Sequence, residues 1–357
     1  MDGLLDLHAC SIPFPVTFFK CSIPHGIWLM GTKLEDLNLT GSHTGPILAD
    51  GLKTPGNISM RRGFRANGEV RFIDAVIDGN VDCASGMFSN AQGCALSMAG
   101  SKIDGRLMLR DNFAAVGEVN LGSIKVGKGI ECMGGAFANL QTNGVALHID
   151  GADVRGNVYL STGTFRGMVN LNGATIYGLV NCDGARFLNG TNTALLACDM
   201  SAKGGLLFSD GVEVQGIVHL SGSQLGYLEW TRVTSPSKAM LNLRTTTVGE
   251  LIDDRQSWPS YGRLLLDGFR YDNIRSRIPL PNKLRIEWLR RQPMEPFHSQ
   301  PYEQLAIVLK KQGDYSTATR VLVAMEDDRI RHADNGFMEN IWLRLYGRIV
   351  GYGYRIW

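Results

Sequence analysis

The chain has 357 residues, 44% of them hydrophobic and 20% charged, with a net charge of +2 at pH 7. This near balance excludes both the basic surface of a nucleic-acid-binding protein and the strongly acidic surface of a DNA mimic, so we expect no nucleic-acid partner. The sequence has no apolar run of the roughly 18 residues that span a bilayer. The segment 1–10 lacks the pattern of a secretory signal, and the seven cysteines lack metal-ligand spacing, so we expect a cytoplasmic protein without a metal or cofactor.

One phrase, Gly-x-Val-x-(Phe/Leu), recurs along the first two thirds of the chain. It begins at Gly68, Gly117, Gly167 and Gly216, at intervals of 49, 50 and 49 residues. A fixed period of this length indicates stacked repeats, in which each unit buries its apolar face against its neighbours.

Within one unit, apolar residues come in pairs two residues apart, such as Val70/Phe72, Ala75/Ile77 and Val81/Cys83. A spacing of two places both members of a pair on one face of a strand, and the steps of five or six between pairs leave room only for a tight bend. Four such sides make one coil, and two coils make one unit. The pattern predicts a right-handed, quadrilateral, parallel β-helix over residues 1–278, with many of the 43 glycines at its corners.

Cys83, Cys132 and Cys182, which we call the cysteine ladder, occupy the same place in successive units. Coils spaced like neighbouring strands would put these residues about 9.6 Å apart, beyond the roughly 4.4–6.8 Å between Cα atoms that a disulfide needs. We therefore expect buried packing of the three thiols, and redox or metal chemistry is the less favoured alternative.

Every second coil carries extra polar residues after its aromatic corner, in segments 89–93, 139–144 and 189–193, which we call the ridge loops. Because the three loops are in register, they should emerge on one edge of the solenoid. One interpretation is that they are ordinary loops whose side chains satisfy their own backbone. The other is a recognition strip for a protein or glycan. The binding residues predicted by the second interpretation are Asn90, Gln92, Asn139, Gln141, Asn143, Asn189 and Asn192.

Several aspartates lie at outward positions between the inward residues, and His148 lies among them. Rows of carboxylates could serve acid–base chemistry, but an aspartate beside a glycine corner more often forms a turn, and no catalytic residue is predicted. The pair Asp253-Asp254 is interpreted as a polar loop.

From about residue 279 prolines replace glycines as the turn-forming residues, and apolar residues recur at the spacing of an α-helix. Helices are predicted over 283–291, 302–312 and 315–331, with Asp314 as an N-cap, in a domain of residues 279–335 that covers the end of the solenoid. The last segment, 336–357, is amphipathic and rich in aromatic and basic residues. It is expected either to dock on the protein or to contact a membrane, through Trp342, Arg344, Tyr346, Arg348, Tyr352, Tyr354 and Trp357.

The four-sided pattern resembles the pentapeptide-repeat proteins. More closely, the phrases at 68–83, 257–259, 266–269 and 301–331 resemble a group of bacterial membrane-associated β-helix proteins related to that superfamily. Members of this group often carry an "oxidoreductase" label, but this chain has neither Gly-x-Gly-x-x-Gly nor Cys-x-x-Cys to support it. The resemblance implies additional coils before the start and hydrophobic segments after the end, so the chain is expected to be a shortened version.

These features favour a non-catalytic binding or assembly scaffold at the cytoplasmic face of a bacterial membrane. A protein partner, peripheral contact with the inner membrane through the last segment, and oligomers formed by end-to-end stacking are expected. The alternatives are an enzyme of undefined reaction that uses the outward carboxylates, and an immunity or defence component that recognises a protein partner.

Overall fold

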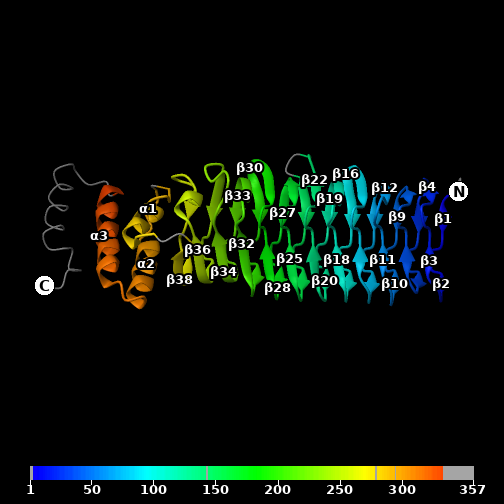
Figure 1. Ribbon diagram of the computed structural model, residues 1–357, viewed down its shortest axis with the longest axis horizontal. Coiled ribbons are helices and arrows are strands. Elements are labelled where there is room, and N and C mark those ends of the chain that lie inside the picture. Colours follow the sequence, from blue (N-terminus) through cyan, green and yellow to red (C-terminus); the bar gives the residue numbers. More distant parts are fainter. Residues whose placement is uncertain (1–2, 142–143, 278–279, 294, 333–357) are drawn as a thin grey trace.

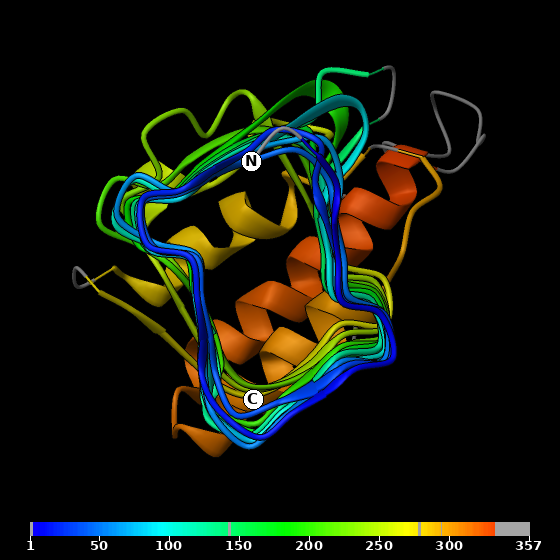
Figure 2. The same cartoon turned by 90° about the vertical axis from the view of Figure 1, so that its right-hand side faces the viewer.

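The alternation of inward and outward residues folds the chain into very short parallel strands that stack from coil to coil. The computed structural model describes residues 3–141, 144–277, 280–293 and 295–332. It forms a parallel β-solenoid of about 12 turns followed by a helical segment (Figure 1). Viewed along its axis, the solenoid has a four-sided outline (Figure 2). The predicted fold class is confirmed.

The strands belong to two parallel sheets, and most strands have only two or three residues. The first sheet contains β1 (Leu5–Asp6), β4 (Ser22–Ile23), β5 (Ile27–Trp28), β8 (His43–Thr44), β9 (Ile47–Leu48), β12 (Arg65–Asn67), β13 (Val70–Arg71), β16 (Met87–Ser97), β19 (Ala114–Asn120), β22 (Ala136–Ala138), β23 (Val145–His148), β26 (Thr164–Arg166), β27 (Met168–Asn170), β30 (Arg186–Leu196), β33 (Glu213–His219), β35 (Ala239–Asn242) and β37 (Leu264–Leu265). The second contains β2 (Ser11–Ile12), β3 (Val16–Thr17), β6 (Lys33–Leu34), β7 (Leu37–Asn38), β10 (Lys53–Thr54), β11 (Ile58–Ser59), β14 (Val76–Ile77), β15 (Val81–Asp82), β17 (Lys102–Ile103), β18 (Arg106–Met108), β20 (Lys125–Val126), β21 (Gly129–Glu131), β24 (Asp153–Val154), β25 (Asn157–Tyr159), β28 (Thr175–Ile176), β29 (Leu179–Asn181), β31 (Ser201–Ala202), β32 (Gly205–Phe208), β34 (Gln224–Trp230), β36 (Thr247–Asp253) and β38 (Arg270–Ser276).

The register places equivalent residues of successive coils directly above one another. Val81 pairs with Leu107, Leu107 with Ile130, and Ile130 with Val158. All four side chains are fully buried. The interior is therefore a set of aliphatic columns, in which each coil is covered by the next one.

One column of the core is aromatic. Its neighbouring rings lie between 5.0 and 6.0 Å apart, measured between centroids. Each pair of this kind adds about 0.5–1.5 kcal/mol to the stabilisation from burial alone. The column consists of Phe64, Phe88, Phe113, Phe137, Phe165, Phe187, Phe208 and Trp230.

The cysteine ladder is buried as predicted. All three side chains have no exposed surface, and backbone hydrogen bonds place Leu109 and Leu160 on the intervening coils. Burial raises the pKa of each thiol of the cysteine ladder well above its usual range, because the thiolate would lose its hydration. These thiols are packing groups and are poor nucleophiles.

Two inward serines connect neighbouring coils by hydrogen bonds. The Ser101 hydroxyl donates to the Phe72 carbonyl at 2.5 Å and accepts from the Ala75 amide at 3.0 Å. The Ser223 hydroxyl donates to the carbonyl of Ala197 in the same way. An inward hydroxyl is tolerated there because both of its hydrogen-bonding functions are satisfied.

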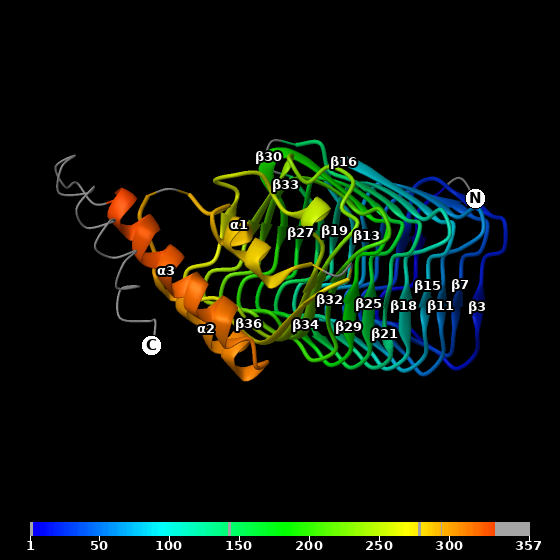
Figure 3. The same cartoon turned by 60° about the vertical axis from the view of Figure 1, so that its left-hand side comes forward.

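Three α-helices follow the solenoid, of which α2 contacts β38 and α3 packs on α2, farther from the solenoid (Figures 1 and 3). Two 3₁₀ turns, η1 (Arg255–Ser257) and η2 (Asn282–Leu284), precede α1 (Arg285–Leu289), α2 (Gln300–Lys311) and α3 (Tyr315–His332). The Asp314 carboxylate accepts a hydrogen bond of 3.0 Å from the amide of Thr317, as expected of the N-cap of α3. None of the described helices has the length and apolar character needed to cross a bilayer.

A buried ion pair joins α1 to the last coils. Arg285 and Asp253 are 3% and 2% exposed, and their side chains meet at 2.5 Å. The Asp253 carboxylate also accepts from the Trp258 indole at 2.8 Å and from the Ser276 hydroxyl at 3.2 Å. The interpretation of Asp253-Asp254 as a polar loop is therefore wrong. Both carboxylates are buried, and each accepts from a segment that only the fold brings near, Arg285 for Asp253 and the Arg232 amide for Asp254.

Candidate functional site

The ridge loops project from one edge of the solenoid (Figure 2). The first and third lie inside the long strands β16 and β30, where the pairing with the next coil is interrupted by register shifts. The second lies between β22 and β23. The predicted alignment of these loops along one edge agrees with this arrangement.

The asparagine at the base of each ridge loop donates its side-chain amide to a carbonyl at the end of that loop or of the residue directly after it. Asn90 donates to Cys94 at 2.9 Å, and Asn189 donates to Thr193 at 2.6 Å. Asn139, which is 7% exposed, donates to the carbonyl of Val145 at 3.0 Å. These three amides build the loops, which is what the first interpretation of the ridge predicts.

The remaining predicted ridge residues differ in their placement. The Gln141 side chain donates at 3.2 Å to the carbonyl of Ala91, so it connects the second ridge loop to the first. Gln92 and Asn192 are exposed. Asn143 lies outside the described residues.

The ridge loops also explain three of the four repeating glycines, those that follow a loop-bearing coil. A Cβ on Gly117 would lie 2.3 Å from the Asn90 carbonyl oxygen, and one on Gly216 would lie 2.4 Å from the carbonyl oxygen of Asn192. At Gly167 the nearest atom would be a carbonyl oxygen of the second ridge loop, at 2.8 Å. All three have φ between +114° and +132°, a region that side chains disfavour. Each loop thus requires glycine on the following coil, and this requirement makes the repeat two coils long.

A groove of about 440 Å³ lies between the second and third ridge loops. Leu140, with 81% of its surface exposed, and Leu188 contribute apolar walls, and Arg166 lies between them. Arg166 and Leu188 belong to a row of outward residues that pair in register from coil to coil. In chain order, the row consists of Val116, Ala138, Arg166 and Leu188. The edge therefore offers apolar contacts beside one exposed cation.

The outward carboxylates are engaged in separate local contacts. The two imidazole nitrogens of His148 lie 3.2 Å from Glu118 and 2.8 Å from Asp150. The hydrogen bond to Glu118 raises the pKa of His148, because it stabilises the protonated ring. Asp82 pairs with Arg61 at 2.9 Å. Among the described residues no group of three or more histidine, cysteine, aspartate or glutamate side chains is arranged to hold a metal ion.

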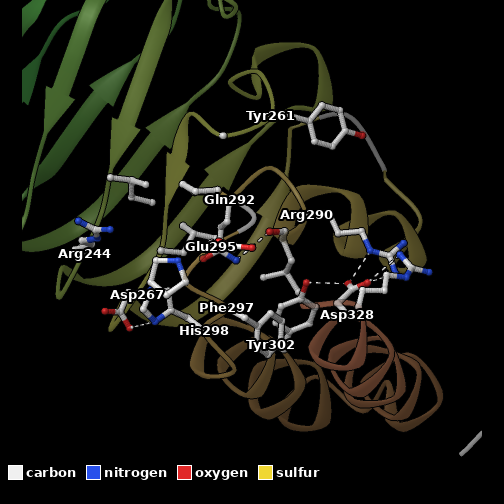
Figure 4. A pocket seen from close by; sticks show the side chains of 17 residues that line it. Arg244, Tyr261, Asp267, Arg290, Gln292, Glu295, Phe297, His298, Tyr302 and Asp328 are labelled. Carbon is white, nitrogen blue, oxygen red and sulfur yellow. Dashed lines mark hydrogen bonds and ion pairs between the residues drawn. The ribbon is translucent and has the colours of Figure 1, made fainter. Parts of the chain in front are cut away.

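A second hollow, which sequence reasoning missed, lies between the last coil and the helices (Figure 4). Its volume is about 550 Å³, within the range of small-molecule sites. We call it the cap cavity. Its principal lining residues are Arg244, Tyr261, Leu265, Leu266, Asp267, Leu289, Arg290, Phe297, His298, Tyr302, Asp328 and Arg331. These residues are spread over almost ninety positions of the sequence, so no local motif predicts the cavity.

The predicted membrane-contact residues, Trp342, Arg344, Tyr346, Arg348, Tyr352, Tyr354 and Trp357, lie outside the described residues. The predicted segment 336–357 lies there as a whole. Comparisons of the chain with models of protein families, with curated proteins and with solved structures found no match.

Proposed function

We propose that this protein is a non-catalytic binding scaffold that holds a protein partner along the edge formed by the ridge loops. The observation that carries the proposal is the groove between the second and third loops, with Leu140 and Leu188 as walls and Arg166 between them. The solenoid interior is filled by packed side chains, so a partner has to bind on the outside.

The chemistry of the groove favours a protein segment with an apolar side chain next to an acidic one. An apolar side chain of the partner would cover the exposed surface of Leu140, and exposed apolar surface of this kind is a common mark of protein contacts. A carboxylate would pair with Arg166, whose guanidinium makes no ion pair with any described residue. Arginine and a few apolar anchors typically dominate the energy of protein interfaces.

The loops are suited to recognition because they are held before a partner arrives. The side-chain amides of Asn139 and Asn189 fix the two loops beside the groove, and Gln141 connects the second loop to the first. A surface that is already ordered loses little conformational entropy on binding.

Photocrosslinking in the native host tests the proposal. A photoreactive phenylalanine analogue replaces Leu140, and in a control protein it replaces Ile307, another exposed apolar residue, on α2, that is 62% exposed. We expect one discrete adduct from position 140 that is lost when Arg166 is changed to Glu and is not formed from position 307. Identical adducts from both positions, or an adduct that survives Arg166→Glu, would contradict the proposal. The melting temperatures should agree, since the substituted side chains are exposed.

We further propose that the scaffold lies at the cytoplasmic face of a bacterial membrane, through the amphipathic segment 336–357. The support is its sequence, in which apolar residues recur at helical spacing together with arginines and tyrosines. Co-sedimentation with anionic liposomes, comparing the full chain with a chain that ends at Asn335, measures this contribution. Equal partitioning of the two proteins would reject it.

A further inference from the structure

The cap cavity combines an apolar floor with the cation of Arg244 at its mouth. We propose that it binds a small amphipathic organic anion, whose apolar body lies on the leucine floor and whose anionic group pairs with Arg244. This inference does not rest on the proposed function, because the cap cavity and the ridge groove belong to different parts of the molecule.

The floor is formed where the last coil meets the helices. Leu265, Leu266 and Leu289 are at most 8% exposed, and the rings of Phe297 and Tyr302 lie 5.8 Å apart beside them. Figure 4 shows these two rings next to each other in the wall. A ligand that covers such a surface gains roughly 25 cal/mol for each Å² of apolar area removed from water.

The wall on the side of α3 has its carboxylate already paired. The Asp328 carboxylate accepts from Arg290 at 2.7 and 3.0 Å, from Tyr302 at 3.0 Å and from Arg331 at 3.1 Å. Asp328 itself is 4% exposed. Because both of its oxygens are occupied, Asp328 offers a ligand no free acceptor.

The mouth of the cavity holds charges of both signs, and Glu295 adds a further carboxylate to the lining. Asp267 lies 3.4 Å from His298, so these two groups face each other. Arg244 is exposed, and its guanidinium makes no ion pair with any residue that the structure describes. Burial and, after it, the positive charge of Arg244 lower the pKa of the nearby His219. A carboxylate or sulfonate at the mouth would neutralise this charge, and a charge-assisted hydrogen bond from guanidinium is among the stronger contacts available.

Binding of 8-anilinonaphthalene-1-sulfonate, which joins a compact apolar body to a sulfonate, tests the inference on the full chain. We expect saturable fluorescence enhancement that octanoate reverses and octanol does not. Arg244→Gln should weaken binding about tenfold or more, as loss of a charge-assisted contact does. Leu265→Phe, which fills part of the cavity, should weaken it as well. Arg65→Gln, which removes an exposed arginine from a distant coil, should have no effect.

Two outcomes would overturn the inference. Binding that is unchanged in both Arg244→Gln and Leu265→Phe would place the probe elsewhere, and loss of binding in Phe14→Ser would assign it to the first coil, where Phe14 is 61% exposed. Equal displacement by octanol and octanoate would remove the role of the anionic group. Melting curves of each variant with and without octanoate provide a second measurement, because a ligand that binds only the folded state raises the melting temperature.

Discussion

The dependence of each ridge loop on a glycine in the next coil leads to a quantitative prediction for Gly117→Ala. An added Cβ would lie 2.3 Å from the Asn90 carbonyl oxygen and 2.7 Å from that of Gly93. Both contacts are with backbone, so relief requires movement of the loop. The matched control is Gly173→Ala, whose φ of +64° is also positive but whose Cβ would meet nothing within 4 Å.

The φ of +64° costs Gly173→Ala about 1–2 kcal/mol, and the φ of +114° costs Gly117→Ala at least as much, because alanine disfavours positive φ. The collision adds the cost of overpacking to Gly117→Ala alone, about 1–3 kcal/mol. We therefore expect Gly117→Ala to lose about 1–3 kcal/mol more than the control in urea unfolding followed by circular dichroism. Hydrogen exchange should accelerate in segment 89–93. A stability difference within about 0.5 kcal/mol, together with unchanged exchange there, would refute the steric explanation of the repeat.

Three further predictions concern the buried ion pair, His148 and the cysteine ladder. Arg285→Met leaves Asp253 buried without its ion pair and should lower the free energy of unfolding by about 3–5 kcal/mol. The control Lys102→Met removes an exposed ion pair and should lower it much less. Equal losses of the two variants in calorimetry would contradict this. The raised pKa of His148 means that its protonated form stabilises the folded state below about pH 6.5, and that this contribution disappears as the pH rises through the folded-state pKa. His148→Gln should therefore flatten the loss of stability as the pH rises above about 6.5, and parallel curves for the two proteins would argue against it. Mass spectrometry after alkylation of the native protein should find the cysteine ladder unmodified while the partly exposed Cys10 reacts, and equal rates would disprove burial.

The features that the sequence predicts well are those repeated at short range. Pairs such as Val70/Phe72 define one side of a coil by themselves, and the recurrence of the same pair 22 to 28 residues later fixes the register. The N-cap at Asp314 is equally local, because donor and acceptor lie three residues apart.

The features that the sequence did not predict depend on distant partners. Asp253 resembles a loop residue until Arg285, 32 positions later, is placed against it by the fold. The cap cavity arises where two differently built segments meet, so its position follows from packing and not from a motif. The sequence left two alternatives for the ridge asparagines: side chains that hold their own loop, or side chains free to bind a partner. The hydrogen bonds from the three side-chain amides to backbone carbonyls favour the first.

The alternation of loop-bearing and glycine-bearing coils limits how such a protein changes length during evolution. Deleting a coil that carries Gly117 or Gly167, or duplicating a loop-bearing coil, would set two loop-bearing coils side by side, and one loop would then face a side chain in place of glycine. Deleting or duplicating two coils together restores the alternation. Folded variants of this solenoid with other lengths should therefore differ by multiples of about fifty residues, which is the spacing between successive Gly-x-Val-x-(Phe/Leu) phrases.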